Sequence, residues 1–468
     1  MMDREVNALF PIRFGQLARL IGGSLVRGQP RAPVRHAVYG NTKYLRSGVV
    51  FFAKENESIR RQLHELKHQS CARVIVSPGW RRSVPQKCPL IVVPDTKQAV
   101  WRLALWQRNR SDALFIGITG SAGKTTTKEM TAAILAQKYP TMKSYANNNI
   151  ASCLPGNLMR LKKRHRVAVL EMGMSSLGNI RRQCQYTRPE VGVVTNVGEA
   201  HVGSLGNSLD NVVRAKQELV DGLSPGGTLI LNADDPGSQR LRTQQFRGRI
   251  LTFGIRHPAT VRAKKIRFLE DGMHFRVGPD RFHIPTWGKH NVYNALAAIA
   301  VGKHLGIPIP DIQRGLQTYS SPHMRLQRIR GIRNYTLIND AYNANPTSMT
   351  AGLQVLKRMA KENVSVAVLG DMHELGLFSS SAHRRVGVAV AKLNPDRLLT
   401  IGPRAVQIAR TAIAKGYPSE NVCSLPHRFP AAAHIRRFAP PGSYIYFKAS
   451  RKIKLEKVVK QLRRKGNG

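Results

Sequence analysis

Acidic residues, aromatic residues and long hydrophobic runs are all scarce in this sequence. Its 468 residues include 27 Asp and Glu against 74 Lys and Arg, and 6% are aromatic. No run approaches the roughly 18 apolar residues of a membrane span, so we expect no transmembrane helix. The first residues, Met1–Val6, lack the apolar core of a signal peptide, and we therefore expect no secretory leader.

Cysteine is scarce as well. The five cysteines are widely spaced and form no Cys-x-x-Cys pair, so the sequence indicates neither a zinc site nor a disulfide framework. Such usage is typical of a reducing compartment, and we expect a cytoplasmic protein. The cysteines are Cys71, Cys88, Cys153, Cys184 and Cys423.

The basic excess gives a formal net charge of +47, which attracts polyanions such as nucleic acids, anionic membranes and nucleotides. Basic residues are spread along the chain and are densest at 451–465, which reads as an amphipathic helix. No RRM-type aromatic pattern and no zinc finger accompany them. We interpret the charge as a basic solvated surface and expect no nucleic-acid partner; the alternative is association with nucleic acid or a membrane.

A glycine-rich loop is the most informative motif. Residues 117–127 read Gly-Ile-Thr-Gly-Ser-Ala-Gly-Lys-Thr-Thr-Thr, between an apolar run at 113–116 and a helical pattern that starts at Lys128. Strand, loop and helix in this order hold nucleotide phosphates, because backbone N–H groups and the helix N-terminus face the oxygens. Lys124 would contact the β- and γ-phosphates and Thr125 a Mg²⁺ ion. The candidate nucleotide contacts are Thr119, Gly120, Ser121, Ala122, Gly123, Lys124, Thr125 and Thr126.

Three α/β segments follow one another, at 1–112, 113–321 and 322–468. In the central segment, short β-branched runs such as 167–171 and 191–195 each end in a polar residue. Such runs are typical of a mostly parallel sheet covered on both faces, whose ligands bind at the carboxyl ends of the strands. Glu171 at such an end would be a natural Mg²⁺ ligand; the alternative is an ordinary strand-end charge.

Further polar residues follow predicted strands or begin predicted helices. His201 could ligate a metal, orient a phosphate or transfer protons, or it could be an ordinary loop residue. Lys216 lies in a helical pattern and reads as a surface charge. Asn291 could contact a purine or cap a helix, while Asp340 could hold a ribose hydroxyl and Arg325 a phosphate.

Taken in order, these motifs resemble the Mur ligase family, the ATP-dependent amide-bond ligases of peptidoglycan precursor synthesis. The resemblance covers about residues 113 to 460. Each motif is short, but eight in the same order make the resemblance specific. The motifs lie at 119–126, 171–173 (Glu-Met-Gly), 195–201 (Thr-Asn-Val-Gly-Glu-Ala-His), 214–218 (Arg-Ala-Lys-Gln-Glu), 232–235 (Asn-Ala-Asp-Asp), 290–295 (His-Asn-Val-Tyr-Asn-Ala), 340–346 (Asp-Ala-Tyr-Asn-Ala-Asn-Pro) and 370–376 (Gly-Asp-Met-His-Glu-Leu-Gly).

The resemblance implies three domains: an N-terminal UDP-substrate domain, a central P-loop ATPase domain and a C-terminal Rossmann-like domain. It also implies a reaction that uses ATP and two Mg²⁺ ions. A substrate carboxylate attacks the γ-phosphate to give an acyl phosphate and ADP, and an amine then displaces phosphate. Such phosphoryl transfer depends on positioning and charge neutralisation.

Roles for single residues also come from the resemblance. Thr125 and Glu171 would hold one Mg²⁺, and His201 would help to hold the second. Lys216 matches a lysine that is carbamylated in many members, which would make it an anionic metal or phosphate contact; Lys124, His201 and Lys216 would form the catalytic set. By matching position, Asn291 would contact adenine, and Arg325 and Asp340 would reach the nucleotide from the C-terminal domain.

The motifs are most similar to those of members that add D-alanyl-D-alanine to UDP-N-acetylmuramoyl-tripeptide, which implies roles in cell-wall biogenesis, cell shape and cell division. The alternative is a related ligase that joins another carboxylate and amine. Residues 1–112 keep this alternative open. A Thr-Asp-Ser-Arg-like element and an Asp-Gly-His element are expected there for the UDP-sugar, but residues 39–43 read Tyr-Gly-Asn-Thr-Lys and no Asp-Gly-His is found. We expect a monomer with small-molecule substrates.

Overall fold

The computed structural model describes residues 7–45, 48–68, 72–200 and 202–464. The chain divides into two compact units, and its strands form three sheets. Unit 1 comprises Met1–Ile116, Tyr139–Leu170 and Arg182–Pro189; unit 2 comprises Gly117–Lys138, Glu171–Arg181 and Glu190–Gly468. In the described residues, no helix is both long and apolar enough to cross a bilayer.

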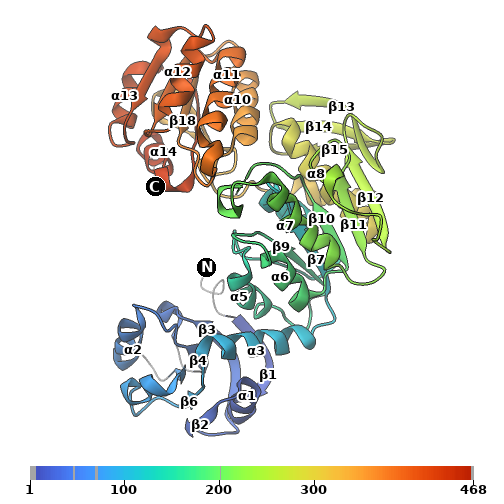
Figure 1. The fold of residues 1–468 in the computed structure, drawn as a ribbon, viewed down its shortest axis with the longest axis vertical. Helices are drawn as coiled ribbons and strands as arrows, with labels where there is room; N and C mark the ends of the chain where they lie inside the picture. The colour runs from blue at the N-terminus through green and yellow to red at the C-terminus, as the bar shows by residue number, and fades with distance from the viewer. Residues whose placement is uncertain (1–6, 46–47, 69–71, 201, 465–468) are drawn as a thin grey trace. The chain divides into compact units, whose positions relative to one another are not determined.

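The first sheet, blue in Figure 1, has six strands in the order β1-β3-β4-β5-β6-β2. Its central pairs are parallel, while β1 and β2 pair antiparallel at the two edges. All four residues of β4 are buried, because both faces of a central parallel strand are covered. The elements are β1 (Asn7–Arg13), α1 (Phe14–Ile21), β2 (Ser24–Arg27), β3 (Pro33–Tyr39), β4 (Val49–Phe52), α2 (Ile59–His68), β5 (Arg73–Val76), β6 (Leu90–Val92) and α3 (Thr96–Asn109).

The second sheet has nine strands in the order β15-β14-β13-β12-β11-β10-β7-β9-β8. The run from β10 to β13 is parallel, and β13, β14 and β15 form an antiparallel extension. Its strands are β7 (Leu114–Thr119), β8 (Thr141–Lys143), β9 (Val167–Glu171), β10 (Val191–Val194), β11 (Thr228–Asn232), β12 (Arg249–Gly254), β13 (Val261–Leu269), β14 (Gly272–Val277) and β15 (Asp280–Ile284). The associated helices are α4 (Lys124–Leu135), α5 (Leu154–Leu158), α6 (Asn179–Thr187), α7 (Leu209–Asp221), α8 (Lys289–His304) and α9 (Ile309–Gln317).

The third sheet, orange to red in Figure 1, has the order β16-β17-β21-β18-β19-β20 and is parallel except for the β16–β17 pair. One core lies between the sheet and α10, α11 and α12, and a second between the sheet and α13 and α14. This doubly wound arrangement confirms the predicted Rossmann-like domain. Its elements are β16 (Gln327–Arg330), β17 (Thr336–Asn339), α10 (Pro346–Ala360), β18 (Ser365–Gly370), α11 (Ser379–Leu393), β19 (Arg397–Ile401), α12 (Val406–Ala414), β20 (Val422–Leu425), α13 (Ala431–Phe438), β21 (Tyr444–Lys448) and α14 (Glu456–Leu462).

The predicted α/β class with a mostly parallel central sheet is confirmed, but the single C-terminal helix predicted at 451–465 is wrong. A short 3-10 turn covers Arg451–Ile453, and α14 begins only at Glu456. Between them, Lys454 has a left-handed backbone with φ of 59°. A left-handed residue cannot continue a right-handed helix, so the basic stretch is split into two elements.

Candidate active site

The glycine-rich loop joins the end of β7 to the start of α4, as the sequence predicts. Gly120 and Gly123 have φ values of 147° and 84°, which L side chains rarely adopt. A Cβ on Gly120 would lie 1.9 Å from Thr195 Oγ1, and one on Gly123 would lie 2.2 Å from Asn294 Oδ1. Both positions therefore require glycine, for conformation and for space.

Residues that follow β10 hold the loop in place. The Ala122 N–H donates to Asn196 Oδ1 at 2.8 Å, and the Thr195 hydroxyl donates to the Ala122 carbonyl at 2.6 Å. The Ser121 hydroxyl donates to the Gly198 carbonyl at 2.8 Å. Protein contacts alone therefore preorganise the loop, so a ligand would lose little free energy in ordering it.

Lys124 begins α4 and arches back over the loop, where Nζ donates to the Gly120 carbonyl at 2.6 Å. The first N–H groups of a helix have no partner within it, and they carry partial positive charge. Burial lowers the pKa of Lys124, while Glu171 acts to raise it and Arg325 to lower it. Lysine, amides and helix end together form an anion-binding site.

Glu171 ends β9 and is 3% exposed. Its Oε2 lies 4.0 Å from Nζ of Lys128, which is fully buried and also lies 3.1 Å from Glu129 Oε1. Lys128 is one helical turn after Lys124, so both lysines lie on the same face of α4. Lys128 was not predicted as a site residue, although its spacing of four residues from Lys124 is a signal in the sequence that indicates it.

Arg325 reaches the same helix from 200 residues further along the chain. Its Nη2 donates to Thr125 Oγ1 at 3.2 Å, and its guanidinium carbon lies 4.5 Å from the centre of the Tyr342 ring. Stacking on an aromatic ring fixes the plane of a guanidinium while its N–H donors stay available. Arg325, the predicted phosphate contact, thus lies next to the glycine-rich loop.

Lys216 is fully buried in α7, and its Nζ donates to Met174 Sδ at 3.4 Å. Burial lowers its pKa well below the usual 10.5; nearby Lys124 lowers it further and Glu218 opposes the shift. The interpretation of Lys216 as a surface charge is therefore wrong. Its spacing contained the signal, because Val212, Ala215 and Leu219 place residue 216 within the apolar stripe of the helix.

Glu218, two residues further along α7, was not singled out from the sequence. Its carboxylate accepts hydrogen bonds from the backbone N–H groups of Gly178, Ile180 and Arg181, at 2.6, 3.0 and 3.0 Å. These groups lie at the start of α6, where intrahelical partners are lacking. Glu218 thereby holds the segment that follows Glu171 to the helix that carries Lys216.

Asn291 lies in the first turn of α8 and uses its side chain within the protein. Its Nδ2 donates to the Trp287 carbonyl at 2.8 Å and to Thr286 Oγ1 at 3.2 Å, and its Oδ1 accepts from Asn294 at 3.1 Å. Asn294 Oδ1 in turn accepts from the Thr127 hydroxyl of α4 at 3.3 Å. The chain of bonds connects Asn291 to the loop helix; its contact with adenine remains a prediction.

Asp340 follows β17 and forms an internal ion pair. Its Oδ2 lies 2.5 Å from Lys448 Nζ and accepts from the Tyr446 hydroxyl at 3.1 Å, while Oδ1 accepts from the Leu326 N–H at 3.2 Å. These bonds fix the segment next to Arg325, and the ribose contact stays a prediction. His201, the other predicted metal ligand, lies outside the described residues.

Comparison with known proteins places this geometry in a family. The model of the Mur ligase middle domain matches residues 118–302, and that of the Mur ligase glutamate ligase domain matches 324–451. UDP-N-acetylmuramoyl-tripeptide–D-alanyl-D-alanine ligase of Bacillus subtilis is 34% identical over 451 residues, which are 95% of this chain and 97% of the relative. The chain belongs to the Mur ligase family. Its members are ATP-dependent ligases.

Two further relatives of this Mur ligase extend over almost the whole chain. The Escherichia coli protein of the same name is 32% identical and covers 98% of this chain and 100% of its own. A crystal structure of MurF from Acinetobacter baumannii is 29% identical, with a TM-score of 0.84 over 97% of this chain and 99% of that one. The similarity therefore includes the N-terminal 112 residues, which the sequence motifs left open.

In this Mur ligase, most of the predicted site residues in the described part gather around the start of α4. The loop, Lys124 and Thr125 lie there, and Arg325 bonds to Thr125 directly. Glu171 acts to raise the pKa of Lys124, and Lys124 in turn acts to lower the pKa of Lys216. Several lysines and an arginine thus surround few carboxylates, an arrangement suited to a polyphosphate.

Proposed function

We propose that this Mur ligase joins D-alanyl-D-alanine to UDP-N-acetylmuramoyl-tripeptide and converts ATP to ADP and phosphate. The proposal rests on the similarity to two relatives that are named for this activity. The matched region covers 97% of the Bacillus subtilis relative and 100% of the Escherichia coli relative. The phosphate-binding loop supplies the ATP site that such a reaction needs.

The reaction balances in two steps. A carboxylate oxygen of the tripeptide bonds to the γ-phosphorus, the bond to the bridging β–γ oxygen breaks, and ADP leaves. The amine of the dipeptide then bonds to the acyl carbon, inorganic phosphate leaves, and the amine loses a proton. The loop amides, Lys124 and Arg325 hold the phosphate charge in place, since positioning and electrostatic stabilisation provide most catalysis of phosphoryl transfer.

The residues present fit Mg²⁺. The Glu171 carboxylate and the Thr125 hydroxyl are the hard oxygen donors that this ion prefers, and both belong to the surroundings of Lys124. We propose that these two residues hold one ion, and that a carbamylated Lys216 and His201 help to hold a second. When bound, the ions would neutralise charge on the transferring phosphoryl group.

The surroundings of Lys216 support its carbamylation. Because burial lowers its pKa, the side chain is a neutral amine more readily than a surface lysine is. A neutral amine nitrogen can bond to the carbon of CO₂ and lose a proton, which leaves a carbamate anion. The side chain would then be a carbamate anion instead of a neutral amine, and the nearby cation of Lys124 would stabilise its negative charge.

We further propose that the enzyme is located in the cytoplasm and acts as a monomer. Among the described residues, Cys88, Cys153, Cys184 and Cys423 take part in no disulfide. Reduced cysteines are typical of a reducing compartment, where ATP is also available.

A second candidate is a ligase with the same chemistry on another acid and amine. It is favoured by the segment at 39–43, where Tyr39 ends β3 and Gly-Asn-Thr-Lys follows. Burial raises the pKa of Tyr39, and Asp95 and Glu55 act in the same direction. This segment is found in place of the Thr-Asp-Ser-Arg-like element that would contact a UDP-sugar, so the second candidate takes a different acid substrate.

Phosphate release from ATP and Mg²⁺, with each substrate added singly and then both together, tests the proposal. Release that requires both substrates, with the joined pentapeptide product found by mass spectrometry, is the expected result. Turnover with a different acid and amine only would support the second candidate. ATP hydrolysis that needs neither substrate would contradict ligation altogether.

A further inference from the structure

A second cluster of ligating side chains lies on the antiparallel extension of the central sheet, apart from the residues assigned to ATP. Strands β14 and β15 pair with His274 directly opposite His283. Met273, Phe275, Phe282 and Ile284 are buried on one face of this pair, so the two histidines share the opposite face.

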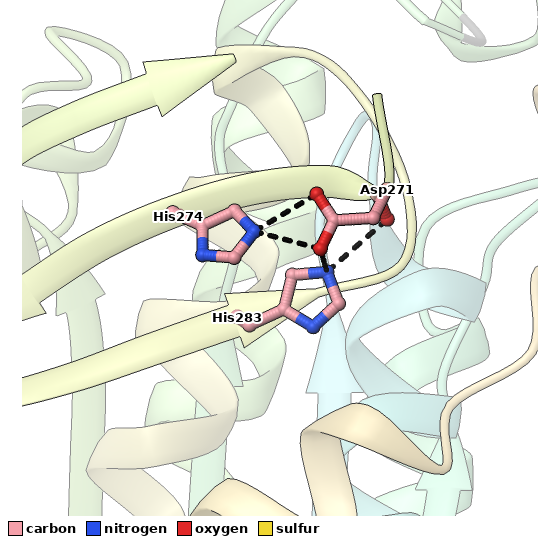
Figure 2. Close-up of side chains that lie close together, drawn as sticks. All are labelled: Asp271, His274 and His283. Carbon is pink, nitrogen blue, oxygen red and sulfur yellow. Dashed lines mark hydrogen bonds and ion pairs between the residues drawn. The ribbon is translucent and has the colours of Figure 1, made fainter. Parts of the chain in front are cut away.

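Asp271 completes the cluster from the turn between β13 and β14. Its carboxylate oxygens lie 2.9 and 3.0 Å from His274 Nε2, and its Oδ2 lies 3.4 Å from His283 Nε2. Figure 2 shows both imidazoles with Nε2 directed at the carboxylate. The three ligand atoms all lie within 4.8 Å of one another.

The backbone around the cluster is held rigidly. Gly272 has φ of 139°, and a Cβ there would lie 2.0 Å from the Ile284 carbonyl oxygen. Trp287 Nε1 donates to the Leu269 carbonyl at 3.1 Å, at the base of the turn. The two imidazole rings stack with centroids 4.4 Å apart. A site on paired strands with a fixed turn requires little reorganisation to bind an ion.

We propose that Asp271, His274 and His283 bind one Zn²⁺ ion. Tetrahedral ligands with bonds of about 2.0–2.1 Å lie about 3.3 Å apart, close to the separations between the carboxylate and the two imidazoles. Two imidazoles and one carboxylate are a donor set for zinc rather than for magnesium, which prefers oxygen. The ion would connect the turn to β15 and leave a coordination position for water.

The neighbouring charges set the expected strength. Arg276 and Arg281 form the next pair on the same face, and Arg267 of β13 lies opposite His274. These cations repel a metal ion, so the affinity will be lower than that of a closed structural zinc site. In the competing interpretation no metal binds. The Asp271 carboxylate then accepts a hydrogen bond from His274, and its backbone carbonyl accepts one from His283 Nε2 at 3.1 Å.

Calorimetric titration of the full chain with Zn²⁺ alone tests the proposal, with Mg²⁺ as a parallel titrant. We expect one zinc equivalent per chain and at least about a tenfold weaker association for His274→Ala, His283→Ala and Asp271→Asn. The double variant Arg276→Ala/Arg281→Ala, on the same face and the same strands, should retain binding or bind more tightly.

Zinc can bind adventitiously to exposed histidines, and His427→Ala controls for this because His427 is exposed elsewhere. Co²⁺ absorption supplies a measurement that does not depend on variants, since a tetrahedral Co²⁺ site of this kind absorbs in the visible range. No zinc binding, or binding that all three ligand variants leave unchanged, would overturn the proposal. Circular dichroism of each variant checks that its fold is retained.

Discussion

Lys216 illustrates how a single side chain changes its chemistry with its surroundings. A lysine on a helix surface is a cation at neutral pH, whereas this one is enclosed by α7 and the segment around Met174. Burial makes the charged form costly, and Lys124 adds repulsion. The residue is thereby suited to become an anion by reaction with CO₂, which a surface lysine does less readily.

The lowered pKa predicts a pH dependence of folding. Between the folded pKa and the usual 10.5, the unfolded chain binds a proton at Lys216 that the folded protein does not. Stability must therefore rise with pH across this window. In CO₂-free buffer, urea unfolding from pH 7 to 10 should show wild type gaining stability relative to Lys216→Met.

The exposed Lys138, just beyond the end of α4, supplies the control for this experiment. Lys138→Met should follow the wild-type curve, because this substitution leaves the buried amine of Lys216 in place. A wild-type curve parallel to that of Lys216→Met would contradict the neutral, buried amine.

Lys124 gives a second prediction at the scale of a residue. Its ammonium lies above the loop and would contact the transferring phosphate, so Lys124→Ala should lower kcat by roughly 10²–10³-fold. Steady-state phosphate release measures this loss, and Lys138→Ala is the matched control on the same stretch of chain. A similar loss in both variants would point to general destabilisation instead.

At the scale of an element, the β7–loop–α4 unit depends on its two glycines. Gly123→Ala should cost about 1–2 kcal/mol for the left-handed backbone alone. Its Cβ would also displace Asn294, which bonds to Thr127 and Asn291, so ATP affinity should fall as well. Urea unfolding and calorimetric ATP titration measure the two effects separately.

Gly226 is the matched control for this substitution. Its φ of 73° imposes a similar backbone cost, but a Cβ there has no atom within 4 Å. Gly226→Ala should lose the same stability and retain ATP binding. Equal ATP affinity in the two variants would show that the contact with Asn294 does not shape the nucleotide site.

Local sequence patterns predicted elements well and distant contacts poorly. The loop between β7 and α4 follows from residues 113–135, since glycine positions and helical spacing lie within one short segment. The Arg325–Thr125 bond joins residues 200 positions apart, and the Asp340–Lys448 pair 108 positions apart. No local pattern encodes such pairs, which is why neither the Arg325–Thr125 bond nor the Asp340–Lys448 pair was predicted.

At the scale of the whole molecule, the few acidic residues are unevenly distributed. Of 27 acidic residues in the chain, Glu171, Glu218, Asp234, Asp340 and Asp371 are buried. Asp234 accepts hydrogen bonds from the N–H groups of residues 255–257, which lower its pKa despite the opposing effect of burial. The surface is strongly cationic because 74 basic residues stand against 27 acidic ones, and the burial of five acids beside three lysines, Lys128, Lys216 and Lys448, changes this excess little.

This surface predicts opposite effects of salt on catalysis and stability. ATP and the UDP-linked tripeptide are anions, so the cationic field should speed their association, and 200 mM NaCl should lower kcat/KM for these two substrates by up to roughly tenfold compared with 20 mM. The same salt screens repulsion among surface cations over about a Debye length and should raise Tm. Sucrose at matched osmolality should leave kcat/KM unchanged, because it screens nothing. If NaCl lowered Tm instead, repulsion among the basic residues would not be a significant cost of this fold, and the cationic surface would act on substrates alone.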